Sequence, residues 1–114
     1  WRGNWKDAIA DYEAYLKKNS SGLIANGVRR SLAYAQESVG QYAEASANFD
    51  KLIGVFDRES SGELLFSSAR CYLAANKPDE AKKRLQRLID EFPDSGYQLQ
   101  ARIELGRLNP TILN

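Results

Sequence analysis

The side chains in this sequence that could perform acid–base chemistry are neighbouring carboxylates, Asp7 with Asp11 and Asp90 with Glu91. Two carboxylates held close together can serve as a general acid and a general base. Both pairs fall in segments whose apolar residues have helical spacing, where charged residues ordinarily form the solvated face. The sequence contains no histidine, which excludes Ser-His-Asp and Cys-His catalytic sites and the commonest metal ligand. We therefore expect a protein that is not an enzyme and that binds no metal and no cofactor.

A basic segment, KKRLQR from Lys82 to Arg87, could contact phosphate groups. Acidic residues bracket it on both sides, so we interpret it as another solvated helix face, with Leu85 pointing inward. The whole chain has 16 Lys and Arg against 15 Asp and Glu, and this balance creates no global field for nucleic acid or anionic lipid. We expect no nucleic acid among its partners.

Cys71 is the only cysteine, so the chain has no internal disulfide that would indicate its compartment. Its place one residue before Tyr72, on the packed side of a helix, predicts a buried and unreactive thiol. The apolar runs are far shorter than the roughly 20 residues that span a bilayer, so we expect no membrane insertion by this chain. The sequence begins at Trp1, without a methionine and just ahead of a repeated motif, and we expect it to be a fragment of a longer protein.

The elements that must position any binding residues are indicated by a repeat of 36 to 37 residues. The stretch GNWKDAIADY, from Gly3, places a glycine, an aromatic residue, an alanine and a second aromatic residue at the same spacing as GQYAEASANF. A third copy, NKPDEAKKRL, has Asn76 in the glycine position and Leu85 in the second aromatic position. Small residues therefore recur at fixed intervals, in the two series Ala8, Ala45, Ala81 and Ala33, Ala69, Gly106. We expect these small residues where helices cross.

The apolar spacing within each repeat is helical, at i, i+4, i+7 and i+8, and no strand-like alternation competes with it. Ser60 and Glu63 predict a capping box, and Pro78 suits a first helical turn. Gly40 and Asn76 suit the left-handed conformation that ends a helix. The sequence thus predicts an all-α fold with helices near 5–18, 25–38, 41–55, 61–75, 78–91 and 96–108, the last ended by Pro110.

This pattern resembles the tetratricopeptide repeat, a helix-turn-helix unit with small residues where its paired helices cross. The segments that carry the resemblance are LAYAQESVGQYAEASANF, from Leu32, and SARCYLAANKPDEAKKRLQRLIDEFP, which closes on Pro93. We expect one domain over 1–114, made of a half repeat at 1–22, repeats at 23–58 and 59–94, and a terminal helix at 95–109. The sequence departs from the pattern at Gln36, where a tyrosine is expected, at Asp57, where the closing proline is expected, and in its longer period.

The resemblance implies a right-handed α-solenoid of antiparallel helix pairs, whose first helices line a concave wall that binds peptides. The residues expected on that wall follow from the small residues Ala33, Ala69 and Gly106. In each helix the next residue should face the groove, together with the residue three before the small one and the residue one turn ahead. The candidate groove residues are Arg30, Tyr34, Glu37, Phe66, Arg70, Leu73, Ile103 and Arg107. Three arginines with two aromatic residues could bind a carboxylate or an acidic peptide through bidentate hydrogen bonds. The alternative is that these arginines are ordinary solubilising residues.

The function expected from this resemblance is a non-catalytic protein–protein interaction module that binds an acidic or C-terminal peptide segment of a partner. Tyr34 and Ser67 occupy positions where a chaperone-tail clamp would need other residue types, so we expect no such binding. The alternative is a structural or self-association segment without a groove ligand, with a weak homo-oligomer formed through the N-terminal helix. The longer period and the segment EFPDS are similar to bacterial cell-envelope members of the family. That likeness favours the periplasm or the envelope over the cytoplasm.

Overall fold

The structure of the chain is a computed structural model, which describes residues 4–109. Gly3 and Pro110, which the sequence pattern uses as a repeat residue and a helix end, lie outside the described residues. The described part of the chain is built from six α-helices and contains no strand. They are α1 (Trp5–Lys18), α2 (Leu23–Ser38), α3 (Tyr42–Leu52), α4 (Arg58–Ala74), α5 (Pro78–Glu91) and α6 (Gln98–Leu108). Each boundary lies within three residues of the range predicted from the sequence.

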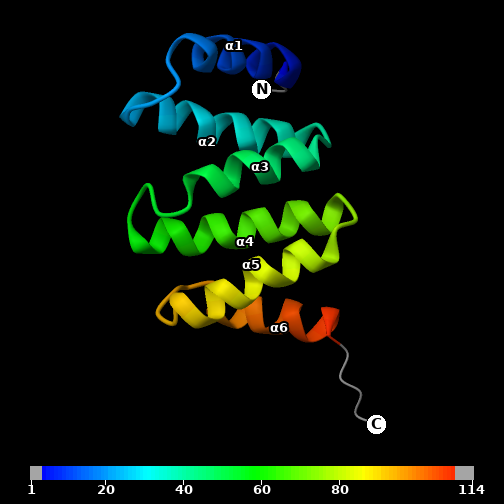
Figure 1. The fold of residues 1–114 in the computed structure, drawn as a ribbon. Coiled ribbons are helices and arrows are strands. Elements are labelled where there is room, and N and C mark those ends of the chain that lie inside the picture. Colours follow the sequence, from blue (N-terminus) through cyan, green and yellow to red (C-terminus); the bar gives the residue numbers. More distant parts are fainter. Residues whose placement is uncertain (1–3, 110–114) are drawn as a thin grey trace.

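The helices form a single stack in chain order, and consecutive helices run in alternating directions (Figure 1). Each helix packs mainly against the one before it and the one after it, and the molecule is elongated, with extents of 52 × 27 × 24 Å. Contacts of this nearest-neighbour kind define an α-solenoid. The all-α solenoid predicted from the sequence is therefore confirmed. Within residues 4–109, no helix combines the length and the apolar character needed to cross a membrane.

Two of the predicted helix ends have the expected backbone geometry. Gly40 follows α2 with a φ of 85°, and Asn76 follows α4 with a φ of 63°. In this left-handed conformation the chain turns back, so that the next amide reaches a carbonyl near the helix end. Gln41 N accordingly donates to Gln36 O at 2.8 Å, and Lys77 N donates to Tyr72 O at 2.8 Å. These short turns let α3 and α5 fold back onto the helices that precede them.

The predicted start of α4 is wrong, because Asp57 rather than Ser60 caps this helix. The Asp57 carboxylate accepts a hydrogen bond from Ser60 N at 2.9 Å, and the helix begins at Arg58. An aspartate side chain here satisfies an amide that the first turn leaves unpaired. Glu63, the other half of the predicted capping box, instead contacts α2. The departure at Asp57 from the repeat pattern thus has a structural role.

Alanines lie where the helices cross, which confirms the expectation for the interior members of both small-residue series. Ala45 and Ala81 are fully buried, and so are Ala33 and Ala69. They let large side chains such as Phe49, Leu85 and Leu88 fill the space between helices. Gly106 differs from this expectation, because it is exposed and a side-chain carbon added at this position would meet no atom of another described helix within 4 Å. The buried small residue of α6 is Ala101.

The apolar face of α1 is partly covered by α2. Ile9 is buried against Leu32 and Ala35, with Tyr12 and Leu16 packed beside them. Trp5, at the start of this face, remains 43% exposed. The helix α2 thus fills part of this face, and self-association through α1 stays a prediction.

Candidate peptide-binding groove

The candidate groove residues lie on alternate helices of the stack, α2, α4 and α6 (Figure 1). Within each helix they follow a spacing of three or four residues, which keeps them on one face. The structure places Arg30, Tyr34 and Glu37 on α2, Phe66, Arg70 and Leu73 on α4, and Ile103 and Arg107 on α6. The inter-helix contacts of these side chains decide which of them form a common surface.

Salt bridges join the α2 and α4 members of this set. Arg70 forms a two-point contact with Glu37, in which Nη2 donates to Oε1 at 2.8 Å and Nε donates to Oε2. Arg30 Nη2 donates to Glu63 Oε1 at 3.2 Å, and the Tyr34 hydroxyl donates to Glu63 Oε2 at 2.8 Å. Two of the three arginines that the sequence suggested for a partner's carboxylate, Arg30 and Arg70, therefore already contact glutamates of the neighbouring repeat.

An apolar hollow of about 220 Å³ opens between α4 and α6. Its walls are Phe66, Ala69 and Leu73 of α4 and the buried Leu85 of α5. Two charged residues complete its lining, Arg70 from α4 and Glu104 from α6. Phe66 also stacks on Tyr97, with ring centroids 5.2 Å apart and an interplanar angle of 28°, which fixes the orientation of that wall.

The structure thus gathers Phe66, Arg70 and Leu73 around one hollow, but Ile103 and Arg107 do not line it. Glu104, which was not among the predicted residues, takes their place. The physical reason is the register of α6. Because Ala101 is its buried small residue, the residue three positions later, Glu104, faces α4. Arg107 contacts Glu104 through Nη1 at 2.8 Å, and its side chain is 69% exposed.

Two of the groove arginines keep nitrogen atoms that form no hydrogen bond with another side chain among residues 4–109. For Arg70 this atom is Nη1, and for Arg107 the atoms are Nε and Nη2. Hydrogen bonding to Glu37 raises the pKa of Arg70, so its charge is fixed. Burial, followed by the hydrogen bond to Glu63, raises the pKa of Tyr34, so its hydroxyl stays protonated as a donor. The groove therefore offers hydrogen-bond donors of fixed protonation state beside an apolar hollow.

Cys71 follows Arg70 on the buried side of α4 and is fully inaccessible to solvent. Burial raises the pKa of this thiol to about 12. A thiol needs its thiolate form to act as a nucleophile or a metal ligand. The prediction that Cys71 is buried is therefore confirmed, and its low reactivity stays a prediction. Among the described residues, no three histidine, cysteine or carboxylate side chains are grouped so that they could hold a metal ion.

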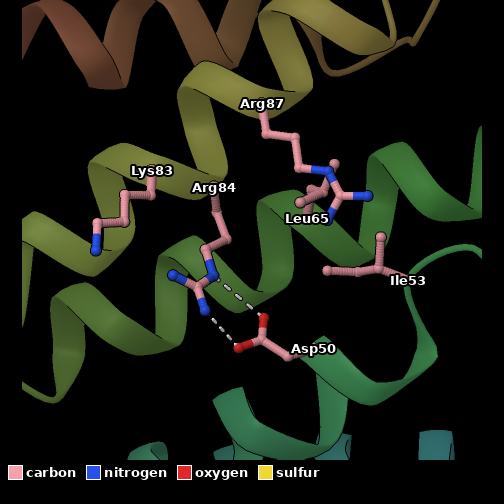
Figure 2. A pocket seen from close by; sticks show the side chains of 6 residues that line it. All are labelled: Asp50, Ile53, Leu65, Lys83, Arg84 and Arg87. Atoms are coloured by element: carbon pink, nitrogen blue, oxygen red, sulfur yellow. Dashed lines mark hydrogen bonds and ion pairs between the residues drawn. The ribbon is translucent and has the colours of Figure 1, made fainter.

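The opposite face of α4 carries a polar cluster that was missed at the sequence level. Asp50 of α3 accepts hydrogen bonds from Ser68 Oγ and Tyr72 OH of α4 and from Arg84 of α5, whose Nη2 lies 2.8 Å from Oδ2. Figure 2 shows Arg84 turned toward Asp50. The sequence interpretation of a solvated KKRLQR face is thus wrong for Arg84, whose side chain is only 21% exposed, and right for the inward direction of Leu85.

A buried amide pair explains the departure from the repeat pattern at Gln36. Gln36 is 2% exposed, and its Oε1 accepts a hydrogen bond from Asn48 Nδ2 at 2.8 Å. Arg29 Nη1 in turn donates to Asn48 Oδ1 at 3.3 Å. Because buried amides are stable only when they are paired, Gln36 and Asn48 must be considered together. The pair joins α2 to α3 where an aromatic residue was expected.

Comparison with known proteins identifies the family. A model described as tetratricopeptide repeat matches residues 38–103, and a second model of the same description matches residues 2–61. The chain is also similar to the outer membrane protein assembly factor BamD of Caulobacter vibrioides, with 27% identity over 120 residues. This similarity covers 95% of the chain but only 38% of that relative. Since each family match spans more than half of this stack of paired helices, the chain belongs to the tetratricopeptide repeat family of protein–protein interaction modules.

Proposed function

We propose that this chain acts without catalysis, by binding an extended peptide segment of a partner protein in the groove lined by α2, α4 and α6. The observation that carries the proposal is the apolar hollow beside Arg70. Ligand sites combine an apolar surface with a small number of oriented polar groups, and this hollow has both. Its apolar walls come from helices that the solenoid holds in place.

The hollow is suited to one apolar side chain of the partner. Burial of a Val, Leu, Ile, Phe or Met side chain contributes roughly 1.5–3 kcal/mol, which is enough to anchor a short segment but not to bind it tightly alone. Phe66 and Leu73 supply the contact surface, and Leu85 closes the bottom. Because Phe66 is stacked on Tyr97, little side-chain freedom is lost on binding.

Arg70 determines where the partner segment should carry an acidic group. Its Nη1 can donate to a side-chain or C-terminal carboxylate of the partner while Nε and Nη2 stay on Glu37. Glu37 therefore orients the guanidinium and need not be displaced. On the other side of the hollow, Glu104 disfavours a second carboxylate and favours a donor, such as a backbone amide or a lysine. The preferred segment has an apolar anchor with an acidic group on the α4 side.

The proposed place of action is the bacterial cell envelope. It is supported by the similarity to a protein named as an outer membrane protein assembly factor, which extends over 95% of this chain. The partner would then be a protein of the periplasm or the outer membrane. A cytoplasmic location is the alternative, and separation of the host cell into cytoplasmic and envelope fractions would distinguish the two.

A second candidate function is structural, with self-association in place of a groove ligand. Leu99 and Ile103, one turn apart on α6, are 69% and 47% exposed. Gly106, a turn further on, is also exposed, so these three positions form a strip without polar side chains on α6. Sedimentation analysis over a wide concentration range tests this candidate, since a monomer at all concentrations would exclude it.

Photo-crosslinking from inside the hollow tests the proposed function. A photoreactive phenylalanine analogue replaces Phe66 in one variant and the exposed Lys51 of α3 in a control variant, each expressed in the native host. We expect an adduct from position 66 that is absent from position 51, and mass spectrometry then identifies the crosslinked segment. A crosslinked segment that binds the parent chain and Arg70→Ala equally well would contradict the proposal.

A further inference from the structure

A second hollow, of about 250 Å³, lies on the face of α4 opposite to the groove. It is lined by Asp50 and Ile53 at the end of α3, Leu65 of α4, and Lys83, Arg84 and Arg87 of α5. Figure 2 shows Lys83 and Arg87 on either side of Arg84. We name it the outer hollow. The proposed function does not use it.

Arg84 cannot bind a ligand there, because all of its donors are occupied. Nε and Nη2 donate to the two oxygens of Asp50, Nη2 also donates to the Tyr72 hydroxyl, and Nη1 donates to the carbonyl and the carboxylate of Glu80. These contacts account for the five N–H groups of a guanidinium. Arg84 therefore stabilises the wall, and it holds α3, α4 and α5 at fixed positions around the hollow.

Arg87, in contrast to Arg84, has donors that are not occupied. Its Nε donates to Glu91 Oε1 at 3.1 Å, and Nη1 and Nη2 form no hydrogen bond with another side chain in the described part of the chain. The side chain of Arg87 is 47% exposed, and its ion pair with Glu91 is an exposed i,i+4 pair, which is weak. Lys83, 70% exposed, has a similar exposed pair with Glu80. Both cations are thus available at the rim of a hollow whose lining also includes the apolar Ile53 and Leu65.

We propose that the outer hollow is a second docking site, which binds an acidic residue flanked by an aliphatic residue in a partner protein. The free fork of Arg87 matches a carboxylate in two-point geometry. The half-buried Ile53 supplies an apolar surface for the neighbouring aliphatic side chain, and the fully buried Leu65 closes the base of the hollow.

Charge distribution selects a protein partner over a lipid surface. An anionic membrane attracts clusters of about four to eight uncompensated cations. Here Glu80 and Glu91 lie on the same helix as Lys83 and Arg87, and the whole chain carries a net charge of only +1. Positive charge that a ligand could reach is therefore limited to the exposed Lys83 and Arg87 at the rim of the hollow. One carboxylate fits this local field better than a charged surface does.

Nuclear magnetic resonance with blocked dipeptides tests the proposal. The isotope-labelled chain is titrated with acetyl-Leu-Asp-amide and with acetyl-Leu-Asn-amide, which lacks only the charge. We expect the aspartate probe to shift the amide signals of Ile53, Leu65 and Arg87, with an affinity about tenfold above that of the asparagine probe. The same loss, about tenfold, is expected for Arg87→Gln with the aspartate probe.

The matched control is Arg102→Gln, which alters an exposed arginine of α6 that does not line the outer hollow. It should bind the aspartate probe as the parent does, and Arg70→Ala should do the same, since Arg70 lies on the opposite face. Three results would overturn the proposal. They are equal affinity of Arg87→Gln and the parent, shifts of the same amides by inorganic phosphate at equal concentration, and Arg87-dependent sedimentation with phosphatidylglycerol vesicles.

Discussion

Removal of the Asp50 carboxylate is expected to destabilise the solenoid, although Asp50 lies near its surface. Asp50 is the shared acceptor for Ser68, Tyr72 and Arg84, which belong to two other helices. The substitution Asp50→Ala leaves two hydroxyls and a guanidinium without this acceptor. In the parent, burial lowers the pKa of Arg84, but hydrogen bonds to Asp50 and Glu80 outweigh burial and raise it. Arg84 stays charged in the variant as well, because a guanidinium is not deprotonated in proteins.

The expected cost follows from the number and the exposure of these contacts. Breaking a buried ion pair costs about 3–5 kcal/mol, whereas an exposed pair contributes about 0–1 kcal/mol. The side chains of Asp50 and Arg84 are 24% and 21% exposed, which places this pair between the two limits. With two hydroxyl contacts added, we expect Asp50→Ala to lower the free energy of unfolding by about 2–4 kcal/mol. For a domain of this size, that corresponds to a decrease in Tm of at least about 8 °C.

Urea unfolding followed by circular dichroism measures this change for Asp50→Ala, Arg84→Ala and the double variant. Lys51→Ala serves as the control, because Lys51 is the next residue on α3 and is exposed. The double-mutant cycle should give a coupling energy of about 1–2 kcal/mol between Asp50 and Arg84. A coupling energy near zero, or a stability of Asp50→Ala equal to that of Lys51→Ala, would refute the reasoning.

Three further outcomes are expected. Ala45→Leu should cost about 1–3 kcal/mol of stability, because Ala45 is fully buried at a helix crossing, and an unchanged Tm would show the crossing to be misplaced. Cys71, with a pKa raised by burial to about 12, should resist iodoacetamide at neutral pH until the chain unfolds, so labelling of the folded chain would contradict its burial. Hydrogen bonding from Ser60 lowers the pKa of Asp57 below its ordinary 3.8, so its contribution to stability is complete above pH 3.8 and is lost as pH falls through the lower folded pKa. Asp57→Asn should remove that acid-dependent part, and an identical pH profile of Tm for both proteins would count against it.

The helices and their crossings were predictable because they depend on local periodicity. A spacing of i, i+4, i+7 and i+8 determines the buried face of a helix, and the alanine series repeats with the supersecondary unit. The boundary at Asp57 was missed because several polar residues near a helix start can serve as its cap. The register of α6 was missed because Gly106 fits the small-residue series although it is exposed.

The polar contacts between helices were less predictable, because they join residues far apart in the sequence. Asp50 meets Arg84 at a separation of 34 residues, and nothing in either local segment indicates the pair. The sequence did contain a pattern that indicates the salt bridges of the groove. Arg30 with Glu63 and Glu37 with Arg70 are both opposite charges separated by 33 residues, slightly less than one repeat. Charge pairs at such a separation indicate salt bridges between equivalent helices of neighbouring repeats.

The central claim is that an acidic group of the partner contacts Arg70 in the groove, and calorimetric titration of the crosslinked segment tests it most directly. Loss of one charge-assisted contact, about 1.5–3 kcal/mol, predicts that Arg70→Ala binds the segment roughly 10- to 100-fold more weakly than the parent and with a flatter dependence on salt. Lys82→Ala, on α5, should bind as the parent does. Equal affinities and equal salt dependence for the parent, Arg70→Ala and Lys82→Ala would contradict the account.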